Sequence, residues 1–422
     1  MLGTTTPLYT VLLASLSWLS QLDIRLISHL VSILSLWVAG VTLYYVGKPY
    51  GAFLAAAVAL TFVSNAFLIT SVGMETLFLL ALMLLALKSY MEQKLYLTGL
   101  LLGLLILTRY ETVLFAGLLG AHFLVRRRKL PLWLLVAMLL LVPWLIFAWS
   151  KFGQIIPHSA VAKLAENAVG HGYPFAVGAI LWWRIYVAHS PAYFLLLPLV
   201  LLGAYSALRN KLQNQPYMLL LAWSVIYFVA ASLVAGSFPW YYGPLIPGLS
   251  ILLVWGAEFL VRFLGTLLGV SPSLRTRVHD MQVGSLGIIT LGIVALQLSS
   301  WTNPWVLTQG RVQDGRDVYL RQVAAWLRQN ATEHDSLAAE EIGILGYYVD
   351  MRIVDLLGLV SPELQPFLEH SRAETLTRAI EIYVPGYVLA CNPDLLRLLR
   401  ASDRYEPVQT YRDRECILYT RY

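Results

Sequence analysis

Long runs of apolar residues recur through the first 300 residues, and they constrain the fold more than any other feature of the chain. Hydrophobic residues make up 58% of the sequence and charged residues 13%, about half the ~25% of an ordinary soluble domain. Backbone can cross the apolar core of a bilayer when it satisfies its own hydrogen bonds, as an α-helix does. We therefore expect an all-α polytopic membrane domain.

Ten stretches are predicted to be spans: residues 27–46, 51–71, 76–90, 95–108, 110–125, 131–149, 191–208, 216–235, 240–262 and 281–300. A single helix from 95 to 125 would be about 46 Å long at ~1.5 Å per residue, too long for a ~30 Å core. We expect instead a hairpin of two short spans that meet at 108–111.

Basic residues gather on one side of this topology. Residues 1–300 hold 17 Lys and Arg and 7 Asp and Glu, whereas residues 301–422 hold 13 and 17. Cytoplasmic loops usually carry the basic excess. The loops placed there contain Lys48, Lys88, Lys94, the run 126–129, Arg209, Lys211, Arg275 and Arg277. The charge thus indicates a cytoplasmic-membrane topology rather than nucleic-acid binding, with the N-terminus, the 150–190 loop and the tail extracytoplasmic.

Residues 301–422 are expected to form a small soluble domain after the membrane domain of residues 1–300. Residues 315–330 match an amphipathic helix with Val318, Val323, Ala324, Trp326 and Leu327 on its apolar side. Short apolar runs follow at 336–339, 342–348, 353–359, 388–391 and 416–419, with helical segments near 372–382 and 393–401. This pattern is typical of an α/β or α+β domain, and we favour α/β.

Two cysteines, Cys391 and Cys416, both lie in this tail. They could pair if the tail lies in an oxidising compartment. We favour the simpler interpretation of two small buried residues in separate strands.

Three charged residues are predicted at membrane depth, at the outer ends of short spans: Glu75, Arg109 and Glu111. A charge held there costs ~2.5 kcal/mol or more, so it usually serves function or lines a wet cavity. The alternative is a structural ion pair of Arg109 with Glu111 or Glu75 that ties helix ends together. The two roles can also coincide.

The outer loops contain further candidates. His158 and Lys163 precede an expected surface helix, and loop solvation or interfacial snorkelling explains them equally well. The stretch GSFPWYYGPLIPG contains Trp240, Tyr241 and Tyr242. These rings form either an aromatic belt at the membrane interface or a stacking surface for a sugar or an isoprenoid chain.

Several motifs are absent from the sequence. There is no Gly-rich phosphate loop followed by Lys and Ser or Thr, no His/Cys metal spacing and no Gly-x-Ser-x-Gly elbow. We expect no cofactor and no metal site, although dependence on a divalent cation stays open. No internal repeat is obvious, which argues against a transporter with duplicated halves.

Three polar motifs follow predicted spans on the outer side: Gly73–Thr76, Thr108–Glu111, and a set running from Phe152-Gly153 through Pro157-His158-Ser159 to Lys163. The tail adds the stretch EEIGILGYYVDMRIVDLLGLVSPE. In this order, the motifs resemble those of bacterial GT-C glycosyltransferases that use polyprenyl-phosphate sugars, relatives of the dolichyl-phosphate-mannose mannosyltransferases and arabinofuranosyltransferases. The likeness covers nearly the whole chain.

The third motif departs from the family. There it reads closer to Pro-Asn-Thr-Phe-Tyr-Ala-Lys, and only Pro157, Ala162 and Lys163 match here. This difference leaves the role of His158 open.

The resemblance implies a cell-envelope hexosyl- or pentosyltransferase that inverts the sugar as it moves one residue from a lipid-linked monophosphate to an extracytoplasmic glycan, lipid or protein. Such a reaction needs a base for the acceptor hydroxyl and cations for the departing phosphate. Arg109 and Lys163 suit the phosphate, and Glu75 and Glu111 suit sugar hydroxyls or the orientation of Arg109.

In relatives the base is an Asp on a long outer loop after a first span, and that loop ends in Gly-x-Thr-x-Pro-Leu before a surface helix. Residues 3–8 match this ending, and residues 8–22 would be the surface helix. We therefore expect residues 1–23 to be the remnant of the first outer loop, with the first span missing, through a wrong start or through degeneration.

Two other functional classes remain open. A carrier or flippase for lipid-linked sugars would use the charged pocket for translocation, and charges on both sides of one cavity would favour it. A catalytically inactive scaffold would explain the missing Asp.

Overall fold

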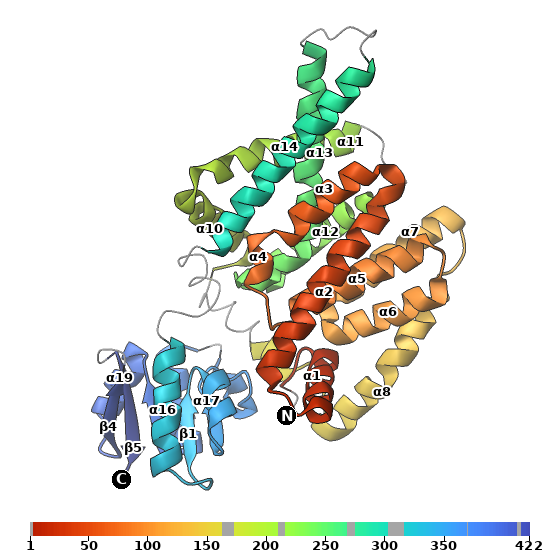
Figure 1. Ribbon diagram of the computed structural model, residues 1–422. Helices are drawn as coiled ribbons and strands as arrows, with labels where there is room; N and C mark the ends of the chain where they lie inside the picture. The colour runs from red at the N-terminus through yellow and green to blue at the C-terminus, as the bar shows by residue number, and fades with distance from the viewer. Residues whose placement is uncertain are drawn as a thin grey trace. The chain divides into compact units, whose positions relative to one another are not determined.

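The computed structural model describes residues 3–162, 173–209, 216–267, 275–302, 316–368, 370–411 and 415–422. Contacts divide the chain into a helical unit, Thr5–Phe147 with Pro174–Gly310, and a second unit, Met1–Thr4 with Ala148–Tyr173 and Arg311–Tyr422. Each unit is described by itself (Figure 1).

The helical unit contains thirteen labelled α-helices within the described ranges, and α8 extends five residues into the second unit. They are α1 Pro7–Ser20, α2 Ile24–Gly47, α3 Ala52–Val63, α4 Ala66–Ile69, α5 Glu75–Met91, α6 Leu95–Thr108, α7 Val113–Arg127, α8 Leu134–Phe152, α10 Phe175–His189, α11 Leu196–Arg209, α12 Pro216–Val234, α13 Ile246–Leu267 and α14 Arg275–Trp301. Short 3₁₀ helices join some of them: η1 Lys48–Tyr50, η2 Tyr110–Thr112, η3 Pro191–Leu195 and η4 Pro239–Leu245.

Six helical stretches of the described residues are long and apolar enough to cross a membrane: Ile24–Tyr50, Leu134–Phe152, Pro191–Arg209, Pro216–Val234, Pro239–Leu267 and Met281–Trp301. They coincide with six of the ten predicted spans. The other four predicted spans fall on α3 with α4, α5, α6 and α7, which have 17 residues or fewer each. Polar or extended residues interrupt the chain between these helices, which is why they are short.

Helix α5 forms the centre of the helical unit. Leu77, Leu80, Met83, Leu84 and Leu87 are all completely buried. A helix that is apolar on every side lies either in a protein core or in lipid, and the complete burial of these side chains places α5 among other helices. Its position fixes the N-terminal residue, Glu75, inside the unit.

Helices α11 and α13 cross closely at two glycines, and Figure 1 shows them next to each other. A Cβ atom on Gly256 would lie 1.8 Å from the carbonyl oxygen of Leu199, and one on Gly203 would lie 2.0 Å from that of Leu252. Small residues at such a crossing let two backbones approach within membrane-spanning bundles.

Aromatic side chains satisfy the irregular backbone around η4. Three carbonyl oxygens accept hydrogen bonds from other helices: Ser237 from Trp182 Nε1 at 3.1 Å, Tyr241 from the Tyr227 hydroxyl at 3.0 Å, and Pro244 from Trp223 Nε1 at 3.2 Å. Non-helical backbone at membrane depth is tolerated when other groups take up its polar atoms.

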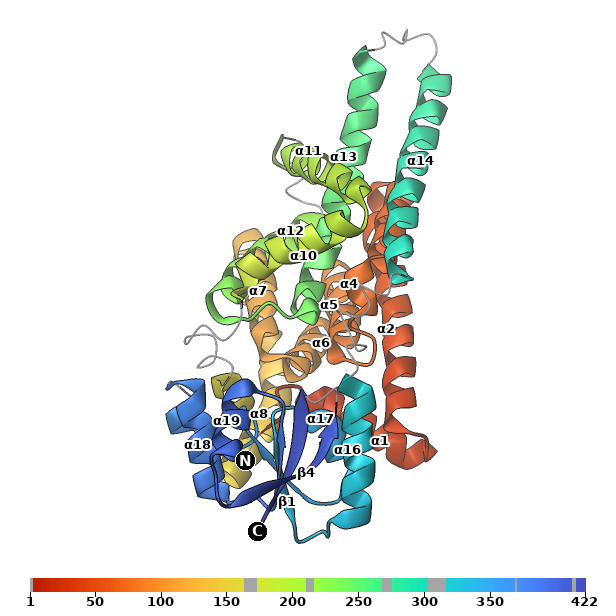
Figure 2. The same cartoon turned by 90° about the vertical axis from the view of Figure 1, so that its left-hand side faces the viewer.

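The second unit contains a five-stranded sheet with helices on both faces (Figure 2). Its elements are α16 Arg316–Asn330, β1 Ser336–Ala339, α17 Ile342–Tyr348, β2 Arg352–Asp355, η6 Pro362–Phe367, α18 Arg372–Tyr383, β3 Tyr387–Ala390, α19 Pro393–Arg400, β4 Tyr405–Tyr411 and β5 Cys416–Arg421. The strand order is β2-β1-β3-β5-β4. Strands β2, β1 and β3 are parallel to one another, and β5 is antiparallel to both of its neighbours, β3 and β4.

Alternating strand residues face two apolar layers. One layer joins Leu337, Leu389 and Leu418 to α16 and α17, and the other joins Val388 and Tyr419 to α18 and α19. The expected α/β arrangement of the tail is therefore present.

Three details differ from the sequence-based expectation. In α16 the predicted Val323, Ala324 and Leu327 are buried, whereas Val318 is exposed and the neighbouring Tyr319 and Leu320 are buried. The run 342–348 forms helix α17, and β4 was not predicted. Strand β4 lies at the sheet edge and contains Pro407, which an edge strand tolerates because its N–H side can face away from the ladder.

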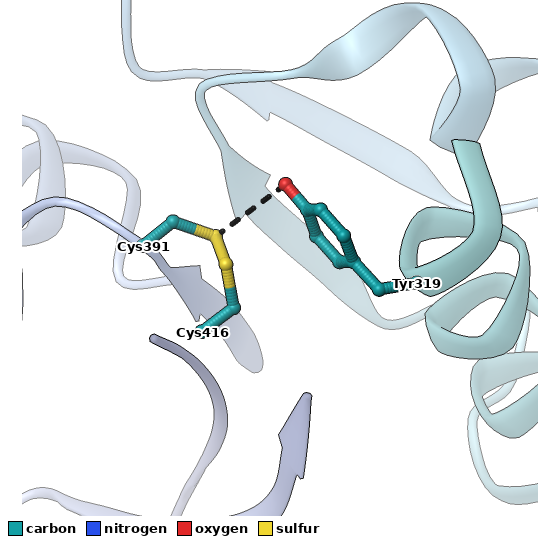
Figure 3. Close-up of a disulfide and its surroundings, with 3 residues drawn as sticks. All are labelled: Tyr319, Cys391 and Cys416. Carbon is teal, nitrogen blue, oxygen red and sulfur yellow. Dashed lines mark hydrogen bonds between the residues drawn. A yellow bond between two sulfur atoms is a disulfide. The ribbon is translucent and has the colours of Figure 1, made fainter. Parts of the chain in front are cut away.

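Cys391 and Cys416 form a disulfide, which corrects the favoured expectation of two unpaired cysteines (Figure 3). Strands β3 and β5 pair Ala390 with Ile417, so the next positions on each strand bring the two cysteines face to face. The physical reason is therefore the antiparallel register, which the separate apolar runs did not reveal. The Tyr319 hydroxyl of α16 lies 3.7 Å from the Cys391 sulfur.

Candidate functional site

The chain enters α5 through a tight turn that places Glu75 at the first position of the helix. Gly73 has a φ of +84°, a conformation that side chains with a Cβ rarely adopt. Ser32 of α2 accepts a hydrogen bond from the Gly73 N–H at 2.7 Å, and the Tyr9 hydroxyl donates to the Gly73 carbonyl at 3.3 Å. The turn is thus held from two helices, and Glu75 with it.

The predicted interruption of residues 95–125 is confirmed. Helix α6 ends at Thr108, Arg109 is extended with φ −156° and ψ 124°, and η2 and α7 follow. The Thr112 hydroxyl donates to the Arg109 carbonyl at 2.7 Å, so the freed backbone group keeps a partner. This break turns the Arg109 side chain into the unit instead of along one continuous helix.

Arg109 meets both candidate acids. Its Nη1 lies 3.4 Å from Glu75 Oε1, and its Nη2 lies 2.5 Å from Glu111 Oε1. The Glu111 contact is ionic, because its geometry does not meet that of a hydrogen bond. The side chains of Arg109 and Glu75 are 10% and 14% exposed, against 36% for Glu111. The structural ion pair and the predicted functional cluster are thus the same group of atoms.

Two carboxylates on one guanidinium leave this cluster with a formal charge of −1. A guanidinium has five N–H donors and each carboxylate has two oxygens. Two guanidinium nitrogens contact the acids, which leaves other N–H groups and the second oxygen of each carboxylate for a ligand. The cluster can therefore offer both donors for a phosphate and acceptors for hydroxyl groups.

The three aromatic residues of η4 face three different partners. The Arg109 guanidinium carbon lies 4.8 Å from the centre of the Tyr241 ring. Tyr242 stacks on Phe175 at 4.3 Å and is 4% exposed. Trp240 stacks on Phe238 at 4.9 Å. Tyr241 belongs to the charged cluster, the Trp240 ring also meets the Tyr241 ring edge-on at 6.0 Å, and Tyr242 packs on Phe175 instead.

His158 belongs to the second unit, within a segment that contacts the sheet domain. Its ring nitrogen Nδ1 contacts the Gln154 amide, and its carbonyl accepts a 3.5 Å bond from Gln365 Nε2. Nearby, the Tyr383 hydroxyl donates to Glu363, which lowers the pKa of that carboxyl. Lys163 lies outside the described residues.

Sequence reasoning missed the residues that hold the cluster. Tyr227 donates to the Tyr241 carbonyl at 3.0 Å, and Ser32 and Tyr9 hold the turn before Glu75. A serine or tyrosine inside an apolar run is common, so no signal in one sequence marks these residues. Across the described residues, no three His, Cys, Asp or Glu side chains gather as a metal site.

Known proteins resemble the chain in two ways. Residues 306–421 match a family model described as a domain of unknown function (DUF8728). No curated protein sequence matches significantly. Two crystal structures of ArnT from Cupriavidus metallidurans, one bound to undecaprenyl phosphate and one in the apo state, are 15% identical, with a TM-score of 0.59 over 99% of this chain and 88% of that chain. The chain therefore has the fold of these ArnT structures, which agrees with the expected helical membrane domain followed by a small α/β domain.

Proposed function

We propose that the chain is a membrane glycosyltransferase that moves one hexose or pentose from a polyprenyl-phosphate donor to an extracytoplasmic glycan, lipid or protein. The observation that carries this proposal is the buried cluster of Arg109, Glu75 and Glu111. It lies in a fold shared with a protein that has been solved with undecaprenyl phosphate bound.

The proposed reaction forms one bond and breaks one. The acceptor oxygen bonds to the anomeric carbon, the bond from that carbon to the phosphate oxygen breaks, and polyprenyl phosphate leaves. The acceptor proton passes to a carboxylate. Glu111 suits this role because it is the more exposed acid, at 36% against 14% for Glu75.

Arg109 is proposed to bind the phosphate with the N–H groups that do not contact the acids. Glu75, the more buried of the two acids, is proposed to orient the Arg109 guanidinium through their ion pair. Lys163 is proposed as a second phosphate ligand on the strength of the motif resemblance. Trp240, Tyr242 and His158 are proposed to lie along the path of the substrates, and no metal ion is assigned to the site.

The soluble domain is proposed to be extracytoplasmic. The excess of Lys and Arg in the opposite loops supports this placement. The Cys391–Cys416 disulfide supports it independently, because disulfides persist in oxidising compartments. His334→Cys, at a position with 89% side-chain exposure, should react with a membrane-impermeant maleimide in intact cells. Reaction only after lysis would reverse the topology.

Binding and turnover of a lipid-linked sugar test the chemistry. Arg109→Lys keeps a positive charge but cannot contact phosphate and both acids at once. It should weaken binding of undecaprenyl phosphate by about 1.5–3 kcal/mol, measured on the purified chain in nanodiscs. Glu111→Gln should leave this binding intact and slow release of undecaprenyl phosphate from a glycosylated donor by roughly 10²–10⁴-fold.

The unaltered protein and the Arg109→Lys variant together distinguish a transferase from a carrier. A carrier would move the lipid-linked sugar across the bilayer of liposomes that have the lipid composition of the nanodiscs, and it would not release undecaprenyl phosphate. If unaltered protein binds the lipid and never turns over a panel of sugar donors, the transferase assignment is wrong. If Arg109→Lys binds undecaprenyl phosphate as tightly as the unaltered protein, the phosphate is bound elsewhere.

A further inference from the structure

A cavity of about 190 Å³ lies inside the helical unit, between the start of α4 and residues of α10, η3, α11, η4, α13 and α14. Most of its lining is apolar, including Phe67, Trp183, Leu196, Val200, Leu249 and Leu253. None of its lining residues carries a charge. A cavity of this size is suited to hydrocarbon, since an apolar cavity of about 150 Å³ accepts benzene.

Two buried amide side chains line the same cavity. Asn65 and Gln297 are 5% and 2% exposed. The side-chain oxygen Oδ1 of Asn65 accepts a hydrogen bond from the Phe67 backbone N–H at 3.0 Å. The side-chain oxygen Oε1 of Gln297 accepts one from the Ser64 hydroxyl at 2.5 Å. Each amide therefore uses its acceptor, while its NH₂ group has no partner among the described residues.

The Tyr186 hydroxyl, on another lining residue, is a buried atom without a partner among the residues described. Buried donors without acceptors are uncommon and reduce stability. The three groups make the cavity apolar with a surplus of hydrogen-bond donors. A matching ligand has an apolar body, no charge at this point, and an oxygen that accepts hydrogen bonds.

We propose that this cavity binds the upper part of one fatty-acyl chain of an ester-linked membrane lipid, with the ester carbonyl accepting from Gln297 and Asn65. A polyprenyl chain has no oxygen along its length, so it would leave both amides unpaired. Water would pair the amides but not suit the apolar remainder of the lining. The cavity lining includes Tyr242, which is also proposed for the substrate path, but none of Arg109, Glu75 and Glu111, and the proposal does not depend on transferase activity.

Photo-crosslinking on the unaltered full chain tests the proposal first. Nanodiscs contain a diacyl phospholipid with a diazirine on the second or third carbon from the ester, or the matched dialkyl ether lipid that lacks the carbonyl. The ester lipid should label peptides of α10 and α13 about three- to tenfold more than the ether lipid, the ratio expected for one lost hydrogen bond. Equal labelling would overturn the role of the amides.

Two variants locate the site. Gln297→Met keeps the shape of the side chain and removes its donor, so the ester preference should fall, and Gln297→Met/Asn65→Leu, which removes both donors, should bring it to about one. Gln282→Met on the same helix does not line the cavity and is its control. Ala179→Phe fills the lining and should abolish labelling of these peptides by either lipid.

The remaining outcomes each contradict the proposal. Unchanged labelling in both Gln297→Met and Ala179→Phe places the label outside the cavity. Loss of ester-lipid labelling on addition of undecaprenyl phosphate, at equal mole fraction, would assign the cavity to the isoprenoid chain. Absence of label from both lipids in the unaltered protein would mean that water alone occupies it.

Discussion

Replacing Arg109 by alanine should destabilise the helical unit, because it leaves two carboxylates without their shared cation. Removing one partner of a buried ion pair typically costs ~3–5 kcal/mol. We expect the lower end, ~3 kcal/mol, since water partly screens the Glu111 side chain at 36% exposure, while Glu75 at 14% is left almost dry. At about 2–4 °C per kcal/mol for medium-sized domains, the melting temperature should fall by roughly 5 °C or more.

Thermal unfolding of the detergent-solubilised protein at neutral pH measures this change. The control is Arg262→Ala, which removes a pair with Glu258 from a site where the arginine is 69% exposed. An exposed pair at this spacing contributes about 0.3–0.5 kcal/mol, so the control should melt within about 1–2 °C of the unaltered protein. The double variant Arg109→Ala/Glu75→Gln should recover about half of the loss. If Arg109→Ala has the same melting temperature as the Arg262→Ala control, the cluster is not buried as described.

Three further predictions concern other parts of the chain. Gly256→Ala should destabilise the α11–α13 crossing by about 1–3 kcal/mol in thermal unfolding, whereas Gly284→Ala, with nothing within 4 Å of its Cβ position, should be neutral. Cys391→Ala/Cys416→Ala should lower the stability of the sheet domain by ~2–4 kcal/mol, seen as faster proteolysis of the tail. Glu363, whose folded pKa is lowered, stabilises the tail above its unfolded pKa of ~4.3, and this contribution disappears as the pH falls through the folded value. Glu363→Gln should therefore flatten the acid limb of the tail's unfolding curve, and an unchanged limb would contradict this.

The sequence predicted the break at Arg109 correctly because its signal is local. A polar run, Thr108 to Glu111, interrupts an apolar stretch that is too long for one span, and length alone forces the chain to turn. The meeting of Arg109 with Glu75 was one of two alternatives, and the structure shows that Arg109 contacts both acids. The stacking of Tyr241 on Arg109 could not be predicted, since it depends on where a 3₁₀ helix 130 residues later enters the unit.

The tail shows a different kind of limit. The strand at Ser336–Ala339 has the bounds of a predicted apolar run, whereas the run 342–348 forms a helix, because a short apolar run is compatible with either conformation. On α16 the prediction is correct for Val323, Ala324 and Leu327 and wrong for Val318, which is apolar but exposed; Tyr319, which carries a polar hydroxyl, is buried. The disulfide required the register of β3 against β5, a long-range pairing that a single sequence does not encode locally.

The hydrogen bonds to the η4 backbone have a consequence for how this protein can vary among its relatives. Trp223 and Tyr227 give their N–H and O–H to carbonyls of an irregular segment, so these two positions are chosen for a donor and not for ring area. Phenylalanine, the substitute usually tolerated at buried aromatic positions, would leave a carbonyl unpaired in a setting without water. Relatives that retain η4 should therefore exchange tryptophan and tyrosine here only for residues with a donor, and frequent phenylalanine at both positions would contradict this account.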